Sequence, residues 1–237
     1  MLDGGDIKLG YTLHLDGASW WNLVGFTVQG GQKGIVTDHA NHDVISGLSV
    51  QNVGDEAVHL RSFSSDNTVE GMVIRNTGLL NTKFGEGIYV GTARSNWCLW
   101  SSCGPDGSNG NIVRNNDISM TTAENIDIKE GTTGGVISGN QLSGVGMVTS
   151  AAKAWINVKG NGWAVTGNNG TESVGDGFQV HRILRGWGLD NVFQHNTANV
   201  NGPGYAIYVQ SPSLGTVVGC DNVAVGAGSG LSNIGCT

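Results

Sequence analysis

The most chemically suggestive stretch of this sequence is AENIDIKEG, at residues 123–131. Glu124, Asp127, Lys129 and Glu130 lie within seven positions of one another, although charged residues make up only 13% of the chain. Carboxylate oxygens suit calcium, and a lysine with a lowered pKa can act as a base. The stretch therefore predicts metal-assisted or acid–base chemistry, provided that the fold brings further polar side chains to it.

An internal repeat indicates which elements position this cluster. A short strand with alternating apolar residues recurs at intervals of 22 to 38 residues. The copies are TLHLD (12–16), GIVTD (34–38), AVHLR (57–61), GIYVG (87–91), NIDIK (125–129), WINVK (155–159), GFQVH (177–181) and AIYVQ (206–210). A second apolar unit follows each copy, and in five of these units one place is held by Asn116, Asn140, Asn168, Asn196 or Asp221.

Two strands per turn with Gly/Asn corners predict an all-β, single-stranded parallel β-helix of about eight coils. The pattern looks like the right-handed parallel β-helix of the pectate-lyase superfamily, and the resemblance covers nearly the whole chain. The longer intervals predict that loops leave the solenoid, mainly at 92–110 and 145–153. A Greek-key sandwich is the alternative, but it does not explain the register of the repeats.

Composition limits the classes of protein. The chain has 237 residues, 40 of them glycine, and we expect one domain over 1–237. The net charge of −7 argues against a nucleic-acid partner, and no apolar run approaches the roughly 18 residues of a membrane span. The abrupt start, MLDGGDIKLG, suggests that an upstream segment was removed. We expect a monomer.

The four cysteines fall into two local pairs. Cys98 lies close to Cys103, and Cys220 lies close to Cys236. Two disulfides in a secreted, extracellular protein are the preferred interpretation, and four buried thiols are the alternative. The spacing does not favour zinc.

The alternation of each strand assigns its polar residues to outward columns. One column contains Glu56, Glu86 and Glu124; the next contains His59, Tyr89, Asp127, Asn157 and Gln179; a third contains Arg61, Lys129, Lys159 and His181. Stacked like charges are destabilising unless something bridges or uses them, so we interpret this face as functional. An ordinary solvated face is the alternative.

The spacing E-x-x-x-x-K, from Glu124 to Lys129, resembles the corresponding coil of the family 6 polysaccharide lyases, the chondroitinase B and alginate lyase group. The resemblance implies that Glu124 binds calcium, with Glu86 of the preceding coil, and that Lys129 is the base. Where that family has an arginine in the following coil, this chain has Lys159, which would lower the pKa of Lys129. The chain is also similar to secreted actinobacterial β-helix proteins of unassigned activity, which share patterns like AENIDIKEGTTGG and DGFQVH.

These observations predict a lyase that cleaves an acidic, uronic-acid polysaccharide by β-elimination. The expected catalytic residues are Lys129, Lys159, Arg61, His181 and Tyr89. The expected substrate-binding residues are His59, Asp127, Asn157, Gln179 and Arg182. The expected calcium ligands are Glu86, Glu124 and Glu56.

Two other functions stay open. A glycoside hydrolase would pair Glu124 with Asp127, Glu86 or Asp176. A non-catalytic glycan-binding or adhesive solenoid would use exposed tryptophans, for which the candidates are Trp97, Trp100, Trp163 and Trp187.

Overall fold

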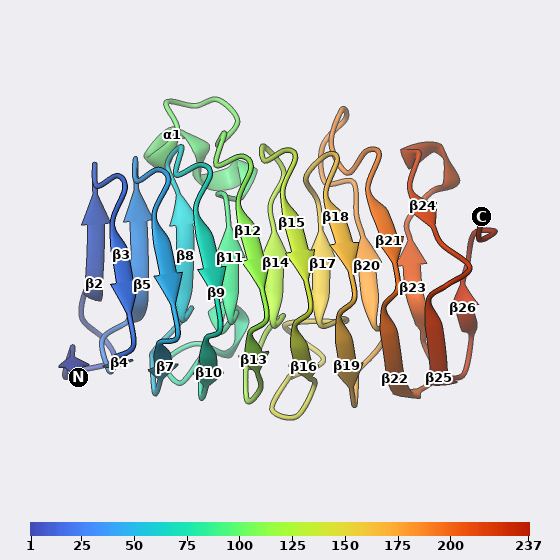
Figure 1. Cartoon of the computed structure of the whole chain (residues 1–237), viewed down its shortest axis with the longest axis horizontal. Coiled ribbons are helices and arrows are strands. Elements are labelled where there is room, and N and C mark those ends of the chain that lie inside the picture. Colours follow the sequence, from blue (N-terminus) through green and yellow to red (C-terminus); the bar gives the residue numbers. More distant parts are fainter.

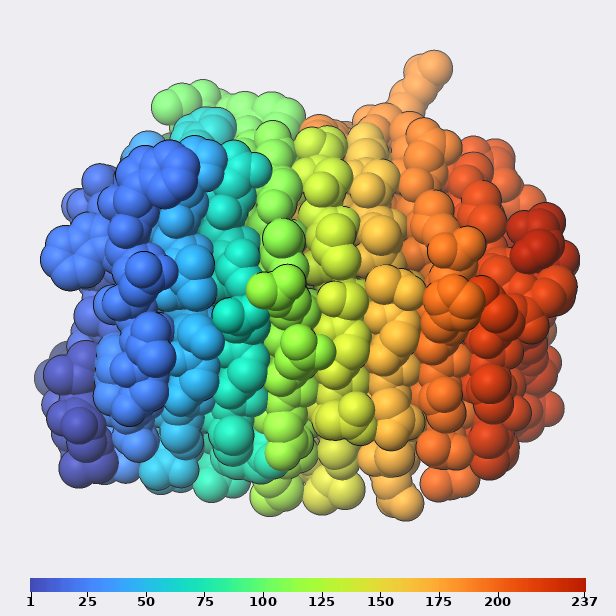
Figure 2. Space-filling model, in the orientation of Figure 1, coloured from blue at the N-terminus to red at the C-terminus, as the bar shows by residue number.

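The computed structural model describes all residues, 1–237, as a parallel β-solenoid of about nine turns with almost no helix. Each full coil contributes one short strand to each of three parallel sheets (Figure 1). Figure 2 shows the coils as successive bands of the surface, in chain order from one end to the other. The predicted fold class is confirmed.

The three sheets are numbered in the order in which a coil contributes to them, beginning with β2. Sheet 1 consists of β2 (Tyr11–Asp16), β5 (Lys33–Asp38), β8 (Val58–Arg61), β11 (Ile88–Val90), β14 (Ile126–Ile128), β17 (Ile156–Val158), β20 (Phe178–Val180), β23 (Tyr205–Val209) and β26 (Gly230–Ser232). Sheet 2 consists of β3 (Asn22–Val24), β6 (Val44–Ser46), β9 (Thr68–Glu70), β12 (Ile112–Arg114), β15 (Val136–Ser138), β18 (Ala164–Thr166), β21 (Val192–Gln194) and β24 (Val217–Val218). Sheet 3 consists of β1 (Leu2–Asp3), β4 (Thr27–Gln29), β7 (Ser49–Gln51), β10 (Val73–Arg75), β13 (Asp117–Ile118), β16 (Gln141–Ser143), β19 (Asn169–Thr171), β22 (Thr197–Gly202) and β25 (Val223–Ala227).

The coil has three strands rather than the two expected from the sequence. The second repeated unit is divided by a sharp corner, as between β15 and β16, where Gly139 has a φ of 65°. Each half is a strand of about three residues, such as β15 or β16, so the alternation of apolar and polar residues is too short to reveal the break. The division turns a flat double layer into a three-sided solenoid around one hydrophobic core of 39 buried residues.

Register in sheet 1 follows the predicted alignment. Ile126 pairs with Ile88 on one side and with Ile156 on the other, and all three side chains are fully buried. Because the side-chain period of a strand is two, this register places Asp127 on the outer face, beside Tyr89 and Asn157.

A ladder of buried asparagines follows the corner between sheets 2 and 3. The Oδ1 atom of Asn140 accepts two hydrogen bonds from Asn116, one from its backbone N–H at 3.0 Å and one from its Nδ2 at 2.9 Å. The next asparagines along the ladder repeat both bonds. The ladder comprises Asn116, Asn140, Asn168, Asn196 and Asn222. Asp221 was expected as the last rung, and this prediction is wrong. One extra residue before β25 moves Asn222 into the ladder, and Asp221 instead pairs with His195 at 2.9 Å.

Loops leave the solenoid at both predicted places. The segment 92–110 contains the short helices η2 (Arg94–Asn96) and α1 (Trp97–Trp100) at one end of the strands of sheet 1 (Figure 1). The segment 145–153 lies between β16 and β17. Two further short helices are η1 (Thr82–Phe84), between β10 and β11, and η3 (Pro212–Leu214).

Both predicted disulfides are present, Cys98–Cys103 and Cys220–Cys236. Two of the tryptophans proposed as exposed sugar-binding residues are buried: Trp163 is inaccessible and Trp97 donates its Nε1–H to a backbone carbonyl. None of the helices has the length and apolarity needed to cross a membrane.

Candidate active site

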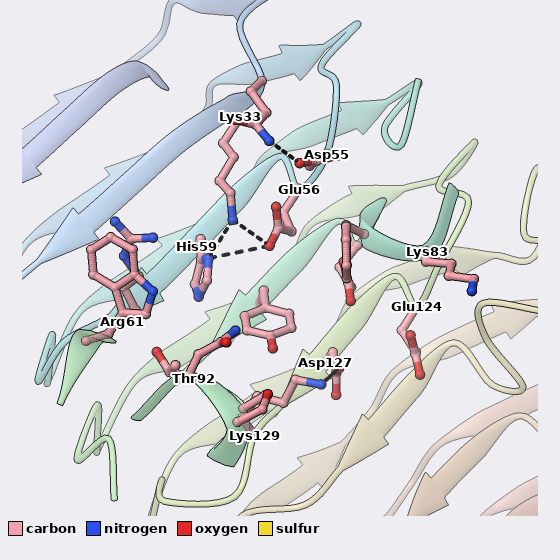
Figure 3. A pocket seen from close by; sticks show the side chains of 18 of the residues that line it. Lys33, Asp55, Glu56, His59, Arg61, Lys83, Thr92, Glu124, Asp127 and Lys129 are labelled. Carbon is pink, nitrogen blue, oxygen red and sulfur yellow. Dashed lines mark hydrogen bonds and ion pairs between the residues drawn. The ribbon is translucent and has the colours of Figure 1, made fainter. Parts of the chain in front are cut away.

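A cavity of about 650 Å³ lies on the outer face of sheet 1 (Figure 3). Its floor comes from strands β2 to β17, and segments containing η1, η2 and α1 contribute to its walls. Its ionisable lining residues, given together with Trp100, are Tyr11, Lys33, Asp55, Glu56, His59, Arg61, Lys83, Glu86, Tyr89, Trp100, Glu124, Asp127, Lys129 and Lys159.

The cavity brings together most of the residues expected from the sequence. Those present are Lys129, Lys159, Arg61, Tyr89, His59, Asp127, Glu86, Glu124 and Glu56. The remaining four expected residues, His181, Asn157, Gln179 and Arg182, do not line it.

Asn157 and His181 form a supporting row beside the cavity. The Nδ2 atom of Asn157 donates to Glu124 at 3.1 Å, and its Oδ1 lies 2.9 Å from Nδ1 of His181. Gln179 donates to Asp176, and the side chain of Arg182 is exposed to solvent. These residues orient the floor of the site or lie beyond it.

Three buried carboxylates lie close together in the site. Oxygens of Glu86, Glu124 and Asp127 lie within 4.8 Å of one another, and each residue is at most 7% exposed. Burial and the neighbouring Asp127 raise the pKa of both Glu86 and Glu124, and Glu56 raises the pKa of Glu86 further. The Oε2 atom of Glu86 has no hydrogen-bond partner. A buried, all-oxygen cluster with an unpartnered atom suits a hard cation such as calcium.

Glu56 is a neighbour of this cluster with a different partner. Its Oε1 atom lies 2.8 Å from Nζ of Lys33 and 3.6 Å from Nδ1 of His59. Figure 3 shows Lys33, Glu56 and His59 meeting on one side of the cavity, with Asp127 and Lys129 on the other. The geometry therefore groups Asp127, rather than Glu56, with the other two carboxylates.

Asp127 lies between the two lysines of the site. Its Oδ2 atom is 2.7 Å from Nζ of Lys129, and its Oδ1 atom pairs with Lys159. Burial opposes the charge on Asp127, but the two lysines outweigh burial and lower its pKa. Burial likewise opposes the charge on Lys129, yet Asp127, Tyr89 and Glu86 raise the pKa of Lys129 well above its usual value. The expectation that Lys159 would lower the pKa of Lys129 is wrong, because a carboxylate separates the two ammonium groups.

Tyr89 occupies the middle of the cavity floor. Nζ of Lys129 lies 4.7 Å from the centre of its ring, and the ring of His59 meets it edge-on at 4.4 Å. Burial raises the pKa of the Tyr89 hydroxyl, so the group is a proton donor at neutral pH.

His59 is held as a neutral ring. Burial, followed by the nearby Lys33 and Arg61, lowers its pKa well below the usual value. Its Nε2 atom lies 2.9 Å from the carbonyl oxygen of Gly91, which places the proton on Nε2. His59 therefore packs against Tyr89 and faces Lys33, and it is not free to take a proton from a ligand.

Arg61 lies two strands from Lys129 in the same outward column. Asp38 accepts two hydrogen bonds from its guanidinium, at 2.8 and 2.9 Å. The hydroxyl of Tyr11 accepts a third at 3.0 Å, and Trp100 stacks on the guanidinium at 3.5 Å. Arg61 is therefore a rigid, preorganised cation at one end of the cavity.

Gly91 fills the column position between Arg61 and Lys129. Its φ is 83°, and a Cβ atom there would approach a methyl group of Thr132 to 2.5 Å. The absence of a side chain keeps the space between the two cations open.

A second cavity of about 410 Å³ adjoins the first. It is lined by Ala93, Arg94, Ser95, Lys129, Glu130, Lys159 and Ile183, and the two cavities share both lysines. Lys129 therefore lies at the junction of two spaces rather than at the closed end of one.

Sequence reasoning missed several lining residues. Alignment of the strands places Tyr11 and Lys33 in the glutamate column, but neither was predicted as a site residue. Lys83 comes from a loop, where no periodicity reports which side chains face the site. Trp100, which was expected only as a sugar-binding candidate, lines the cavity from another loop.

Comparison with solved structures identifies a similar protein. The crystal structure of an alginate lyase from Paenibacillus sp. str. FPU-7 superimposes with a TM-score of 0.89 and 34% sequence identity. The match covers 98% of this chain and 77% of that chain. No family model matches the chain, and no curated protein matches it. With this identity over almost its full length, the chain belongs to the same family of β-helical polysaccharide lyases as the Paenibacillus alginate lyase.

Proposed function

We propose that this protein cleaves a uronic-acid polysaccharide by β-elimination, with alginate as the first candidate substrate. One observation supports the proposal above all: Nζ of Lys129 lies 4.7 Å from the centre of the Tyr89 ring, which puts a candidate base beside a candidate acid in a cavity whose further cations suit an anionic polymer. The substrate named for the related Paenibacillus enzyme supports alginate. The narrower resemblance to the family 6 lyases remains part of this proposal.

The reaction has three requirements. The uronate carboxylate must be neutralised, the C5 proton must be removed, and the glycosidic oxygen must leave with a proton. We assign C5 proton removal to Lys129 and protonation of the glycosidic oxygen to Tyr89. Asp127 keeps Lys129 charged in the free protein, so Lys129 becomes a base only after Asp127 is engaged elsewhere and the ammonium has released one proton to solvent.

The remaining residues have binding and positioning roles. Arg61 is two strands away and is held by Asp38 and Tyr11 through Nε and Nη2, so we assign it to binding a substrate carboxylate through Nη1 rather than to proton transfer. Lys159 and Lys33 add positive charge to the floor. Through Asn157, His181 orients Glu124.

Calcium is the proposed cofactor. Glu86, Glu124 and Asp127 would hold it, and it would supply charge to neutralise the uronate carboxylate. Two disulfides also favour an oxidising compartment, and we propose that the protein is secreted.

A panel of acidic polysaccharides tests the proposal. β-Elimination creates an unsaturated sugar that absorbs ultraviolet light, so absorbance should rise with alginate and stay flat with neutral glycans. Lys129→Ala should abolish the rise while leaving the fold intact. An absorbance trace that stays flat with every uronan would overturn the proposal.

A glycoside hydrolase is the second candidate, because two buried carboxyls with raised pKa values lie side by side at Glu86 and Glu124. Hydrolysis would release reducing ends without any unsaturated product. The same panel, assayed for reducing ends, separates the two reactions.

A further inference from the structure

The second cavity continues the line of the first one past Lys129. The first cavity extends from Lys159 past Lys129 toward Arg61 and Tyr11, over β2 to β17. The second cavity lies between the loop at Ala93–Ser95 and the loop at Ile183, which follows β20. A polymer that passes Lys129 can therefore extend in both directions along the solenoid.

The second cavity is positively charged. Arg94, Lys129 and Lys159 line it, and Glu130 is its single acid. The Oε1 atom of Glu130, a residue only 2% exposed, accepts the backbone N–H of Arg94 at 2.8 Å. This bond fixes the backbone of the loop at Arg94.

Arg94 differs from Lys129 and Lys159, the other cations of the second cavity, in having no ion-pair partner. Arg61 is bound to Asp38, Lys33 to Glu56, and both Lys129 and Lys159 to Asp127. The guanidinium of Arg94 forms no ion pair, and its side chain is exposed toward solvent. It is available to bind an anion without first losing a protein carboxylate.

We propose that the second cavity is a subsite for one uronate residue, on the opposite side of the cleaved bond from the Arg61 subsite. Arg94 binds the carboxylate of that residue, since a guanidinium matches a carboxylate with two parallel hydrogen bonds. The substrate chain then occupies both cavities, and the enzyme cuts it internally. This inference rests on the proposed lyase function.

Kinetics of Arg94→Gln provide the first test. Loss of one charge-assisted pair at a partly exposed site should lower kcat/KM on alginate about tenfold, mainly through KM. The matched control is Arg114→Gln, which removes an exposed arginine paired with Glu70 on sheet 2, away from both cavities. The control should retain wild-type kinetics. Wild-type kinetics in Arg94→Gln would overturn the subsite.

The size of the first products provides the second test. Internal cleavage should produce oligosaccharides of mixed length in the first minutes, with an early fall in viscosity. Release of a single small product from chain ends would overturn the proposal of internal cleavage while leaving the lyase function intact.

A binding measurement separates the two proposals. Calorimetric titration of an eight-residue saturated alginate oligosaccharide into Lys129→Ala protein measures affinity without turnover. Addition of Arg94→Gln to this background should weaken binding about tenfold. An unchanged affinity would refute the subsite, whether or not the wild type cleaves any uronan. Inactivity of the wild type on every uronan would instead refute the lyase function.

Discussion

Two ladders of stacked polar residues follow this solenoid, and they differ in how their atoms are satisfied. In the asparagine ladder between sheets 2 and 3, each internal amide accepts from one neighbouring coil and donates to the next. In the glutamate ladder of sheet 1, Oε2 of Glu56 and Oε2 of Glu86 have no partner, and the pKa values of Glu86 and Glu124 are raised.

The comparison teaches that repetition alone does not reveal the role of a column. Both ladders are buried, and both repeat one residue type at the same coil spacing. The neutral, fully bonded column stabilises the fold. The charged, incompletely bonded column stores an unfavourable interaction that a cation or a substrate can relieve.

The largest expected effect is on activity, on the sheet 1 side of the comparison. Lys129→Ala should lower the rate of alginate cleavage by about 10³-fold or more, because general acid–base groups contribute on this scale. The melting temperature should change by only a few degrees, since Asp127 keeps Lys159 as its partner. A variant that retains full activity would remove Lys129 from the chemistry.

The next effect is on stability, at the asparagine ladder. Asn168→Ala should lower the free energy of unfolding by roughly 2–4 kcal/mol, because it leaves buried donors of Asn140 unpaired. Urea denaturation measures the loss, and activity per folded molecule should persist. Asn169→Ala is the matched control on the neighbouring position, where the side chain is only half-buried, and it should cost less than about 0.5 kcal/mol.

A paired carboxylate should behave differently from the glutamate ladder. Burial opposes the charge on Asp38, but Arg61, Ser62 and His14 outweigh burial and hold its pKa far below 3.8. Because the folded pKa is depressed, the stabilisation is complete above about pH 5 and fades as pH falls below the unfolded value of about 3.9.

Asp38→Asn should therefore cost roughly 1.5–3 kcal/mol at pH 7, because hydrogen bonds to a charged group contribute on this scale and both Asp38 and Arg61 are buried. The gap between variant and wild type, measured by thermal unfolding across pH, should narrow steadily below about pH 4. A gap that stays constant down to pH 2 would show that the charge is not responsible.

The smallest effect sharpens the contrast between the ladders. Without calcium, Glu86→Gln should raise the free energy of unfolding at pH 7 by about 0.5–1 kcal/mol, because it removes a buried acid from beside Glu56 and Asp127. Calcium should raise the melting temperature of the wild type and have little effect on this variant. A calcium response of wild-type size in Glu86→Gln would exclude the cluster as the metal site.

Much of the fold could be predicted because the solenoid repeats at short range. In-register stacking carries the alternation of one strand to the next, so Tyr89, Asp127 and Asn157 were correctly aligned from apolar neighbours alone. The third strand of each coil was missed because Gly139 and its equivalents turn the chain within an apolar unit. A single inserted residue before β25 was enough to exchange Asp221 for Asn222.

The candidate site was predictable only as far as its columns. Alignment assigned Lys129 and Lys159 to one column and Asp127 to the next, but it did not show that Asp127 reaches both lysines. That contact depends on side-chain directions, and it reverses the expected pKa of Lys129. Trp100 and Arg94 come from a loop without periodicity, so their positions near the site required the three-dimensional structure.

The asparagine ladder also bears on how such a protein can change in evolution. All of its amides point the same way, so each coil offers its neighbours the same donors and acceptors. A coil duplicated within the ladder would find every partner already in place, which makes the coil a natural unit of gene insertion. The same event between β14 and β17 would separate Asp127 from Lys159, so we expect length to vary along the solenoid but not through the candidate active site.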